Sequence, residues 1–397
     1  MDPISPLPAI VALVMAFATS FLLVKKFGAP PLQGRFASID GLRGYLAFFV
    51  FLHHSCIWYF YLRTGQWQVP PSNLYTHFGQ TSVALFFMIT GFLFFSKLIE
   101  GKTKRIDWGK LFVSRILRLV PLYFFLMFSL FLIVAYLSNG ILNEPFQKLL
   151  IKMVRWFGFT ILGGPNLNGI EYTGLIIAGV AWSLPYEWFF YLSLPLLALM
   201  IGVVAPLPFI ALSVVSLFYF EIWNPNIYYL SFLSGITAAF LCRSSRFRDF
   251  AVRKISSFVV LACLASVVTF YSSVYGVAPN LLLAIAFALI ASGNTLFGLL
   301  ISPVSRALGE LAYGIYLLHG ISLFIVFTFI IGWAEAKLLS SISHWLIIAL
   351  ISPVLIFICF FTFRFIEYPA MQSTVAVTVW LRARFGFIFN KRTADAT

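Results

Sequence analysis

The sequence predicts an all-α integral membrane protein, a polytopic bundle of about eleven transmembrane helices. Hydrophobic residues make up 61% of the chain and charged residues only 10%, whereas soluble domains carry about 25% charged residues. The apolar residues also fall in long runs without the alternation of a membrane β-barrel. Helices are then the remaining way to satisfy backbone hydrogen bonds in hydrocarbon.

The apolar runs define the predicted spans, because about 20 apolar residues are needed to cross a bilayer as a helix. Eleven runs meet this expectation: 8–24, 42–62, 81–99, 119–138, 180–203, 206–222, 226–242, 256–275, 279–298, 308–332 and 344–366. The first is interpreted as an anchoring helix and not as a signal peptide. Its leader MDPISPLP has no basic residue, while Lys25 and Lys26 follow the apolar stretch.

The basic residues predict the orientation of the bundle, since Lys and Arg in short loops stay on the cytoplasmic side. With the N-terminus outside and the C-terminus cytoplasmic, 22 of the 27 basic residues lie in cytoplasmic segments. The net charge of +14 then reflects topology and attraction to anionic lipid in the bilayer. This interpretation argues against a nucleic-acid partner.

One connection, residues 139–179, is long, external and partly apolar. Lys148, Lys152 and Arg155 recur in it near helical spacing. An interfacial or re-entrant amphipathic helix is therefore expected here instead of another span. A span at this place would reverse every later loop and put the basic cluster at 243–254 outside.

Ionisable side chains at membrane depth are the first candidates for function. Arg43 and His54 are eleven residues apart in the second predicted span, which puts them on one helical face and about 16 Å apart along the axis. His54 near mid-bilayer could take a proton from a hydroxyl, or it could only hydrogen-bond between helices. Neighbouring His53 points away and is the weaker candidate.

A pair of arginines marks the start of the fourth predicted span. Arg115 and Arg118 are three residues apart, so they share a helical face and could engage phosphate oxygens bidentately. The alternative is anchoring to lipid headgroups under the positive-inside rule.

Two further clusters lie in later spans. Glu187 sits where an unpaired carboxylate is costly, so a cation, a histidine or a proton should accompany it. Glu310, Tyr313, Tyr316 and His319 follow one another at spacings of three, with His319 deep in the membrane. A packing role is favoured over chemistry for the two tyrosines.

Several signatures are missing from the chain. There is no Walker A loop, no Gly-x-Ser-x-Gly elbow and no His-Glu-x-x-His. The four cysteines are spread singly, which argues against a disulfide framework or a zinc site. The histidines and carboxylates do not occur at spacings typical of metal ligands, so no metal site is predicted.

The ordered motifs resemble the acyltransferase 3 family of integral membrane O-acyltransferases, which includes bacterial O-antigen and exopolysaccharide acetylases. The residues that carry the resemblance are Ile39-Asp40-Gly41-Leu42-Arg43-Gly44 with His54, Arg115 to Arg118, Trp182-Ser183-Leu184 with Glu187 and Tyr191, Tyr313 to His319, and Arg364 to Pro369. They divide the chain into an added N-terminal anchor at 1–35, a ten-helix acyltransferase 3 membrane domain at 36–370, and a cytoplasmic basic tail at 371–397.

The resemblance implies a bacterial inner-membrane enzyme. It would move an acyl group, usually acetyl from cytoplasmic acetyl-CoA, to a hydroxyl of a glycan or lipid-linked saccharide, as in lipopolysaccharide O-antigen modification or exopolysaccharide biosynthesis. Arg43, Arg115 and Arg118 would bind the CoA phosphates, and His54 would act as general base or acyl acceptor. The remaining expected catalytic residues are Arg43, Asp40, which would orient Arg43 or another partner at the cytoplasmic end, and Glu187 and His319, which would shape the acceptor end.

Some members of the family carry a C-terminal SGNH hydrolase-like domain that is missing from this sequence. If transfer needs such a partner, another protein is expected to supply it. Two alternatives stay open: a non-enzymatic transporter or flippase of a lipid-linked glycan, and an acyltransferase of the same family that acts on a small lipophilic acceptor. Geometrically, the hypothesis requires a continuous path from the arginines to His54.

Overall fold

A computed structural model of the chain describes residues 2–31, 36–223 and 226–384. Its longer elements are α1 (Pro6–Phe27), α2 (Ala37–Thr64), α3 (Asn73–Glu100), α4 (Trp108–Leu137), α5 (Phe146–Phe157), α6 (Leu184–Met200), α7 (Leu207–Trp223), α8 (Tyr229–Leu241), α9 (Ser245–Ala251), α10 (Lys254–Phe270), α11 (Val277–Ala291), α12 (Pro303–Glu310), α13 (Ala312–Ile325), α14 (Trp333–Leu338), α15 (Ser341–Thr362), α16 (Tyr368–Gln372) and α17 (Thr374–Arg384). Short turns of 3-10 or π-helix complete the set: η1 (Thr173–Ile177), η2 (Val180–Ser183), η3 (Asn226–Tyr228), η4 (Leu299–Ile301), η5 (Val326–Ile330) and η6 (Phe363–Glu367).

The predicted fold class, a polytopic membrane bundle of helices, is confirmed. Each of the eleven predicted spans coincides with a helix or with a helix and its adjoining turns. Six helices within the described ranges are long and apolar enough to cross a membrane, or seven if the bent pair α9 and α10 forms one span. The others fall below this limit because they are short, as with α8 at 13 residues and α11 at 15.

Local sequence explains where several helices begin. Ser72 caps α3, Asp107 caps α4 by accepting from the Lys110 amide at 2.9 Å, and Ser340 caps α15. Each of these side chains satisfies a backbone N–H that has no partner within its own helix. The polar residues between the apolar runs therefore fix the helix starts.

Helix α2 is the central helix of the bundle and packs against α3, α12 and α13. Its contacts with α12 and with the preceding turn η4 depend on glycine. A Cβ added at Gly309 would lie 1.9 Å from the carbonyl oxygen of Asp40, and one added at Gly41 would lie 1.8 Å from the carbonyl oxygen of Leu300. Small residues allow such close approach of helix backbones in membranes, and this contact brings Asp40 and Arg43 beside α12.

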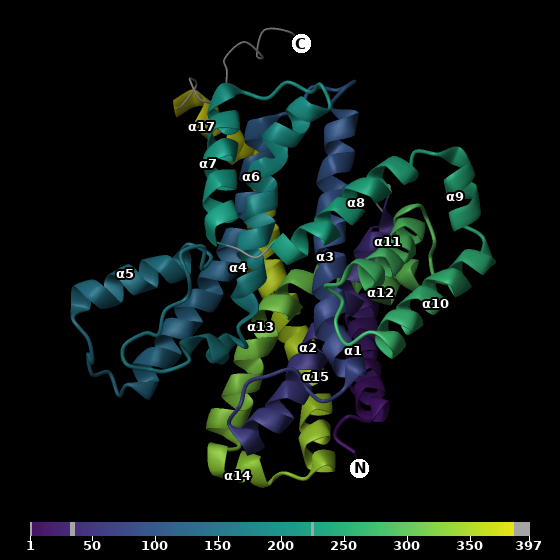
Figure 1. Ribbon diagram of the computed structural model, residues 1–397. Coiled ribbons are helices and arrows are strands. Elements are labelled where there is room, and N and C mark those ends of the chain that lie inside the picture. The colour runs from purple at the N-terminus through teal and green to yellow at the C-terminus, as the bar shows by residue number, and fades with distance from the viewer. Residues whose placement is uncertain (1, 32–35, 224–225, 385–397) are drawn as a thin grey trace.

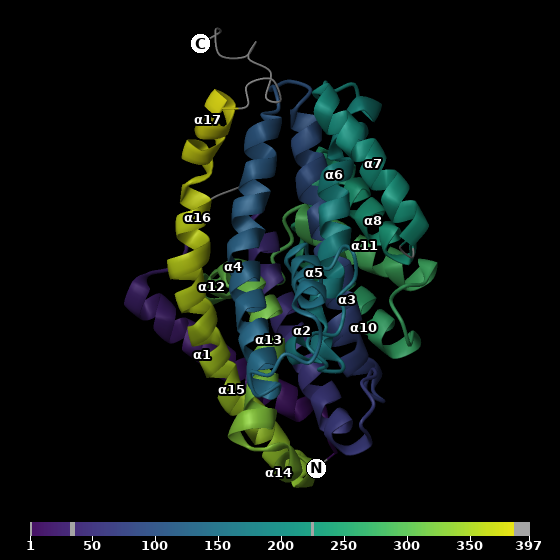
Figure 2. The same cartoon turned by 90° about the vertical axis from the view of Figure 1, so that its left-hand side faces the viewer.

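The two ends of the bundle are clearly separated. The connection from α3 to α4 and helix α17 lie at one end, whereas the start of α1, the connection from α2 to α3 and α14 lie at the other (Figure 1). Helices α15, α16 and α17 follow one another along one side (Figure 2). The end that carries α17 is the one predicted to be cytoplasmic.

Helices α1 and α5 lie at the periphery, where the sequence predicted an anchoring helix and an amphipathic helix. Helix α1 lies at the edge of the bundle against α15 and α12, and much of its apolar surface is exposed. The segment with Lys148, Lys152 and Arg155 forms the amphipathic helix α5, which projects from the side of the bundle (Figure 1). Its apolar face, with Phe146, Leu150 and Val154, is exposed, as expected for an interfacial helix.

The predicted basic tail at 371–397 is helical where it is described. Helix α17 packs against α4, and Arg382 forms an ion pair of 2.5 Å with Asp107. Arg35, Lys391 and Arg392, which were also predicted to be cytoplasmic, lie outside the described residues.

Candidate functional site

A cavity of about 530 Å³ lies inside the bundle, where α2, α3, α4, α6, α12 and α13 meet. It contains five of the seven residues assigned from the sequence: Asp40, Arg43, Arg115, Arg118 and Glu187. The remaining lining includes aromatic and aliphatic side chains, among them Phe86, Phe87, Leu93 and Tyr191. An apolar pocket with a few convergent polar groups is the usual form of a small-molecule site.

Four arginines line this cavity: Arg43, Arg115, Arg118 and Arg306. The Arg115 guanidinium lies over the Phe94 ring at 5.1 Å, and one nitrogen of Arg118 contacts the Met371 sulfur at 2.9 Å. None of the four forms an ion pair with a carboxylate in the described part of the chain. This concentration of positive charge suits a polyanionic ligand.

Carboxylates face the same space. Asp40 interacts electrostatically with Arg43 and Arg118, which is compatible with the orienting role predicted for it. Glu187, in the first turn of α6, accepts a hydrogen bond from the Tyr191 hydroxyl. The partner of Glu187 is thus a tyrosine hydroxyl, whereas the sequence analysis considered only a cation, a histidine or a proton.

His54 and His319 lie next to each other in space although 265 residues separate them in the sequence. Nε2 of His319 is 2.9 Å from Nδ1 of His54. Nδ1 of His319 is also 2.9 Å from the Ile315 carbonyl oxygen, and Nδ1 of His54 is 3.1 Å from the Val50 carbonyl oxygen. Both contacts reach back four residues along the same helix.

These contacts fix the neutral tautomer of both rings. A carbonyl oxygen can only accept, so Nδ1 of His319 must carry its hydrogen, and Nε2 of the same ring must then accept. The donor to that Nε2 is Nδ1–H of His54, which leaves a lone pair on Nε2 of His54. Nε2 of His54 is thus the ring nitrogen of the pair that is able to accept a proton, while Nδ1 of the same ring contacts His319.

The histidine pair is not part of the cavity lining. Tyr316, one turn before His319 on α13, lines the cavity, and its ring lies 6.3 Å from the His319 ring and 6.1 Å from the Phe86 ring. The expected continuous path from the arginines to His54 is therefore not observed, because neither histidine lines the arginine cavity. His54 nevertheless keeps some exposed surface.

The tyrosine hydroxyls of α13 hold neighbouring elements in place. Tyr313 donates to the Leu119 carbonyl oxygen at 2.8 Å. Tyr316 lies 2.7 Å from the Ser183 hydroxyl and donates to the Val180 carbonyl oxygen at 3.1 Å. These contacts agree with the packing role favoured from the sequence, and they join α13 to α4 and to the turn before α6.

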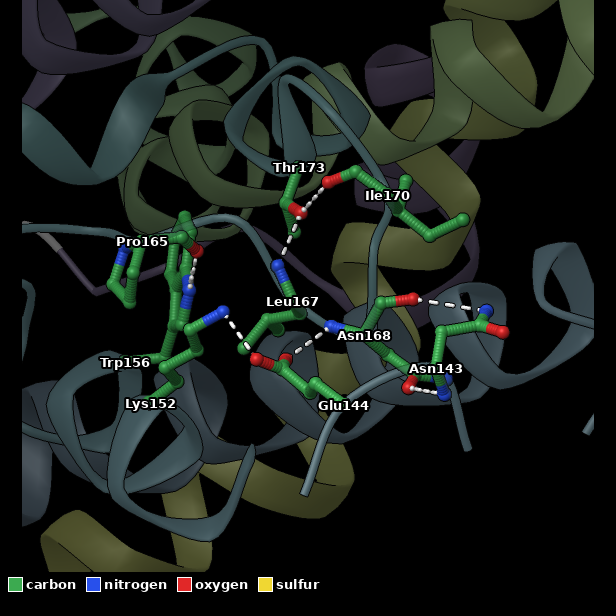
Figure 3. A network of polar contacts seen from close by, with 9 residues as sticks. All are labelled: Asn143, Glu144, Lys152, Trp156, Pro165, Leu167, Asn168, Ile170 and Thr173. Carbon is green, nitrogen blue, oxygen red and sulfur yellow. Dashed lines mark hydrogen bonds and ion pairs between the residues drawn. The ribbon is translucent and has the colours of Figure 1, made fainter. Parts of the chain in front are cut away.

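The segment between α4 and α6 is fastened by a polar network (Figure 3). Glu144 accepts from Lys152 Nζ at 2.5 Å and from the Asn168 amide at 2.7 Å. Burial raises the pKa of the Glu144 carboxyl, but these two hydrogen bonds outweigh it, and the net pKa lies below the ordinary value. The far end of the segment reaches α13, since a Cβ at Gly320 would lie 2.4 Å from the Ile177 backbone.

Three residues near the site were missed from the sequence. Arg306 was counted only as a loop charge, yet it lines the cavity and donates to the Pro30 carbonyl oxygen. Glu367 was noted only as part of a motif, but it is fully buried at η6 and interacts electrostatically with Arg118. Trp67, in the connection between α2 and α3, stacks on His54 with ring centroids 6.1 Å apart.

Helix α15 is followed by the π-turn η6, and π-turns often mark functional sites. The sequence gives no sign of this turn.

The described residues contain no group of three or more His, Cys, Asp or Glu side chains placed to hold a metal ion. The four cysteines are free and buried.

Comparison with protein-family models gives one match: the model for the acyltransferase domain of the acyltransferase 3 type covers residues 36–364. Comparisons with curated proteins and with solved structures gave no match.

Proposed function

The chain belongs to the acyltransferase family whose domain model covers most of its length, and we propose that it moves an acetyl group from cytoplasmic acetyl-CoA to a hydroxyl of a surface or lipid-linked glycan. Its membership and its apolar helices make it a membrane acyltransferase. The acetyl donor, the glycan acceptor and the bacterial inner membrane are the parts that we propose.

The arginine-lined cavity supports a CoA thioester as the donor. CoA carries several phosphate charges, and Arg43, Arg115 and Arg118 together provide guanidinium groups that bind phosphate oxygens in pairs. Arg306 adds a fourth positive charge at the same cavity. The apolar lining beyond the arginines, including Phe86 and Leu93, suits the pantetheine arm.

The pair of histidines supports general-base chemistry at the other end. Nε2 of His54 accepts the proton of the acceptor hydroxyl while the hydroxyl oxygen attacks the thioester carbonyl. The carbon–sulfur bond then breaks, and the thiolate of CoA takes the proton from His54. In the relay version, Nε2 itself attacks the thioester, the carbon–sulfur bond breaks and CoA leaves as the thiolate. In a second step the hydroxyl oxygen attacks the acyl-imidazole, the imidazole leaves, and the hydroxyl proton passes to the thiolate.

The observation that carries this proposal is the lone pair left on Nε2 of His54 by its contact with His319. For the thioester to meet it, side chains between the cavity lining and His54 have to move, because His54 does not line the cavity. Tyr316, which lines the cavity and lies beside His319, is the side chain that we expect to rotate.

The proposal is tested by following the acetyl group. Full-length protein in lipid nanodiscs is given acetyl-CoA with a radiolabelled acetyl group together with surface glycan extracted from cells that lack the gene. We expect label in the glycan and a mass gain of one acetyl group per modified sugar. Label that appears only in a lipophilic small molecule would refute the glycan acceptor.

The same experiment addresses the transporter alternative. If glycan crosses the membrane of proteoliposomes without gaining acetyl, and acetyl-CoA is not consumed, the chain moves its ligand and does not modify it. To separate direct transfer from relay, the protein is mixed with labelled acetyl-CoA without acceptor. Label that stays on His54 after denaturation at neutral pH indicates the relay.

A further inference from the structure

We propose that Trp67, Tyr61 and Trp333 form a stacking subsite that receives a pyranose ring of the acceptor and presents its hydroxyl to His54. This inference rests on the proposed function, because it names where the acceptor of that reaction binds. It concerns the side of His54 that faces away from the arginine cavity.

The aromatic side chains form a chain of contacts that begins at the base, from His54 to Trp67, Tyr61 and Trp333. The Trp67 ring is nearly parallel to the His54 ring, with centroids 6.1 Å apart and planes at 18°. Tyr61 meets Trp67 edge to face at 5.2 Å and Trp333 at 5.6 Å. All three side chains remain partly exposed, so their surfaces are available to a ligand.

The place of this cluster in the bundle is the second argument. Tyr61 is in the last turns of α2, Trp67 follows α2, and Trp333 begins α14. These elements lie at the end of the bundle opposite to α17 (Figure 1). Because His54 is partly exposed without lining the arginine cavity, an acceptor can approach it from the aromatic end while the donor occupies the other.

The chemistry of the cluster fits a sugar ring better than an aliphatic chain. The C–H face of a pyranose packs flat on an aromatic ring, and its hydroxyls need hydrogen-bond partners at the edge. The fully buried indole Nε1–H of Trp58, one turn after His54, has no acceptor among the described residues, and in this proposal a sugar hydroxyl supplies that acceptor. Trp58 also contacts Trp67 edge to face at 5.8 Å.

Aromatic residues also gather at membrane surfaces as anchors, and the test must separate that role from sugar binding. Full-length protein in nanodiscs is assayed with acetyl-CoA and two kinds of probe, methyl hexopyranosides and open-chain hexitols. The variants are Trp67→Ala and Trp67→Phe, with Trp380→Ala on α17 as a matched control for loss of an exposed tryptophan. Acetyl-CoA binding is measured on every variant as a check of folding and of the donor site.

We expect Trp67→Ala to raise KM for the pyranosides by about tenfold, with acetyl-CoA affinity unchanged. Trp67→Phe should restore most of the loss, Trp380→Ala should have no effect, and the hexitols should be poor acceptors for all variants. If the wild-type protein acetylates pyranosides with a KM that Trp67→Ala leaves unchanged, the subsite is wrong and the proposed function stands. If the wild-type protein acetylates the extracted glycan but no pyranoside, the subsite is wrong and the proposed function stands, and if it acetylates neither, both proposals are overturned.

Discussion

Replacing His319 separates its orienting role from the role of His54 as base. In His319→Phe, a ring of similar size remains, but the acceptor for Nδ1–H of His54 is lost. That hydrogen has a second acceptor, the Val50 carbonyl oxygen at 3.1 Å, so the tautomer of His54 is retained. The cost is then that of one hydrogen bond, about 1 kcal/mol, which corresponds to about fivefold in kcat.

The assay is acetyl transfer from acetyl-CoA under saturating donor and acceptor. KM for acetyl-CoA should stay unchanged, because His319 does not line the arginine cavity. His319→Gln offers a side-chain oxygen to the same donor and should recover most of the rate. The reasoning is refuted if His319→Phe has the wild-type rate, or if its loss equals that of His54→Ala, for which about 10² to 10⁴ is expected.

Three other predictions concern the donor, the fold and the external segment. Arg118→Gln should weaken acetyl-CoA binding by about tenfold or more in a direct binding assay, whereas Arg382→Gln, at the surface pair with Asp107, should not. Gly309→Ala should lower the free energy of unfolding by about 1–3 kcal/mol, measured by thermal unfolding, because its Cβ would overlap the backbone of α2. Glu144 has a pKa below its ordinary value, so its contribution to stability is full above that ordinary value and is lost as the pH falls through the lowered pKa. The protection factors of residues 139–179, corrected for the intrinsic pH dependence of amide exchange, should therefore fall in that acidic window in the wild-type protein, and they should be low and independent of pH in Glu144→Gln.

The bundle could be predicted from the sequence because lipid imposes a simple rule on it. Long apolar runs must become helices, and each of the eleven runs did so. The amphipathic helix α5 was predicted from the spacing of Lys148, Lys152 and Arg155. The lengths of the apolar runs did not reveal that helices α8 and α11 are too short to cross a bilayer as helices. Apolar residues in the adjoining turns lengthen these runs without being part of the helix.

A joint role for Arg43, Arg115 and Arg118 was expected from the family resemblance, and the structure places all three at one cavity. The separation of His54 from that cavity was not expected. It depends on how α13 is rotated and on the Tyr316 side chain, which contacts Ser183 and Val180 far away in the sequence. Contacts between residues so far apart in the chain cannot be predicted from the periodicity of a single sequence.

The central claim is that Nε2 of His54 is the base or acyl acceptor of the transfer. It is tested most directly by comparing wild-type protein and His54→Gln, both in nanodiscs, for acetyl-CoA affinity and for acetyl transfer. We predict equal affinity, because His54 does not line the arginine cavity, together with a loss of transfer of about a hundredfold or more. Transfer at the wild-type rate by the folded variant would contradict the account.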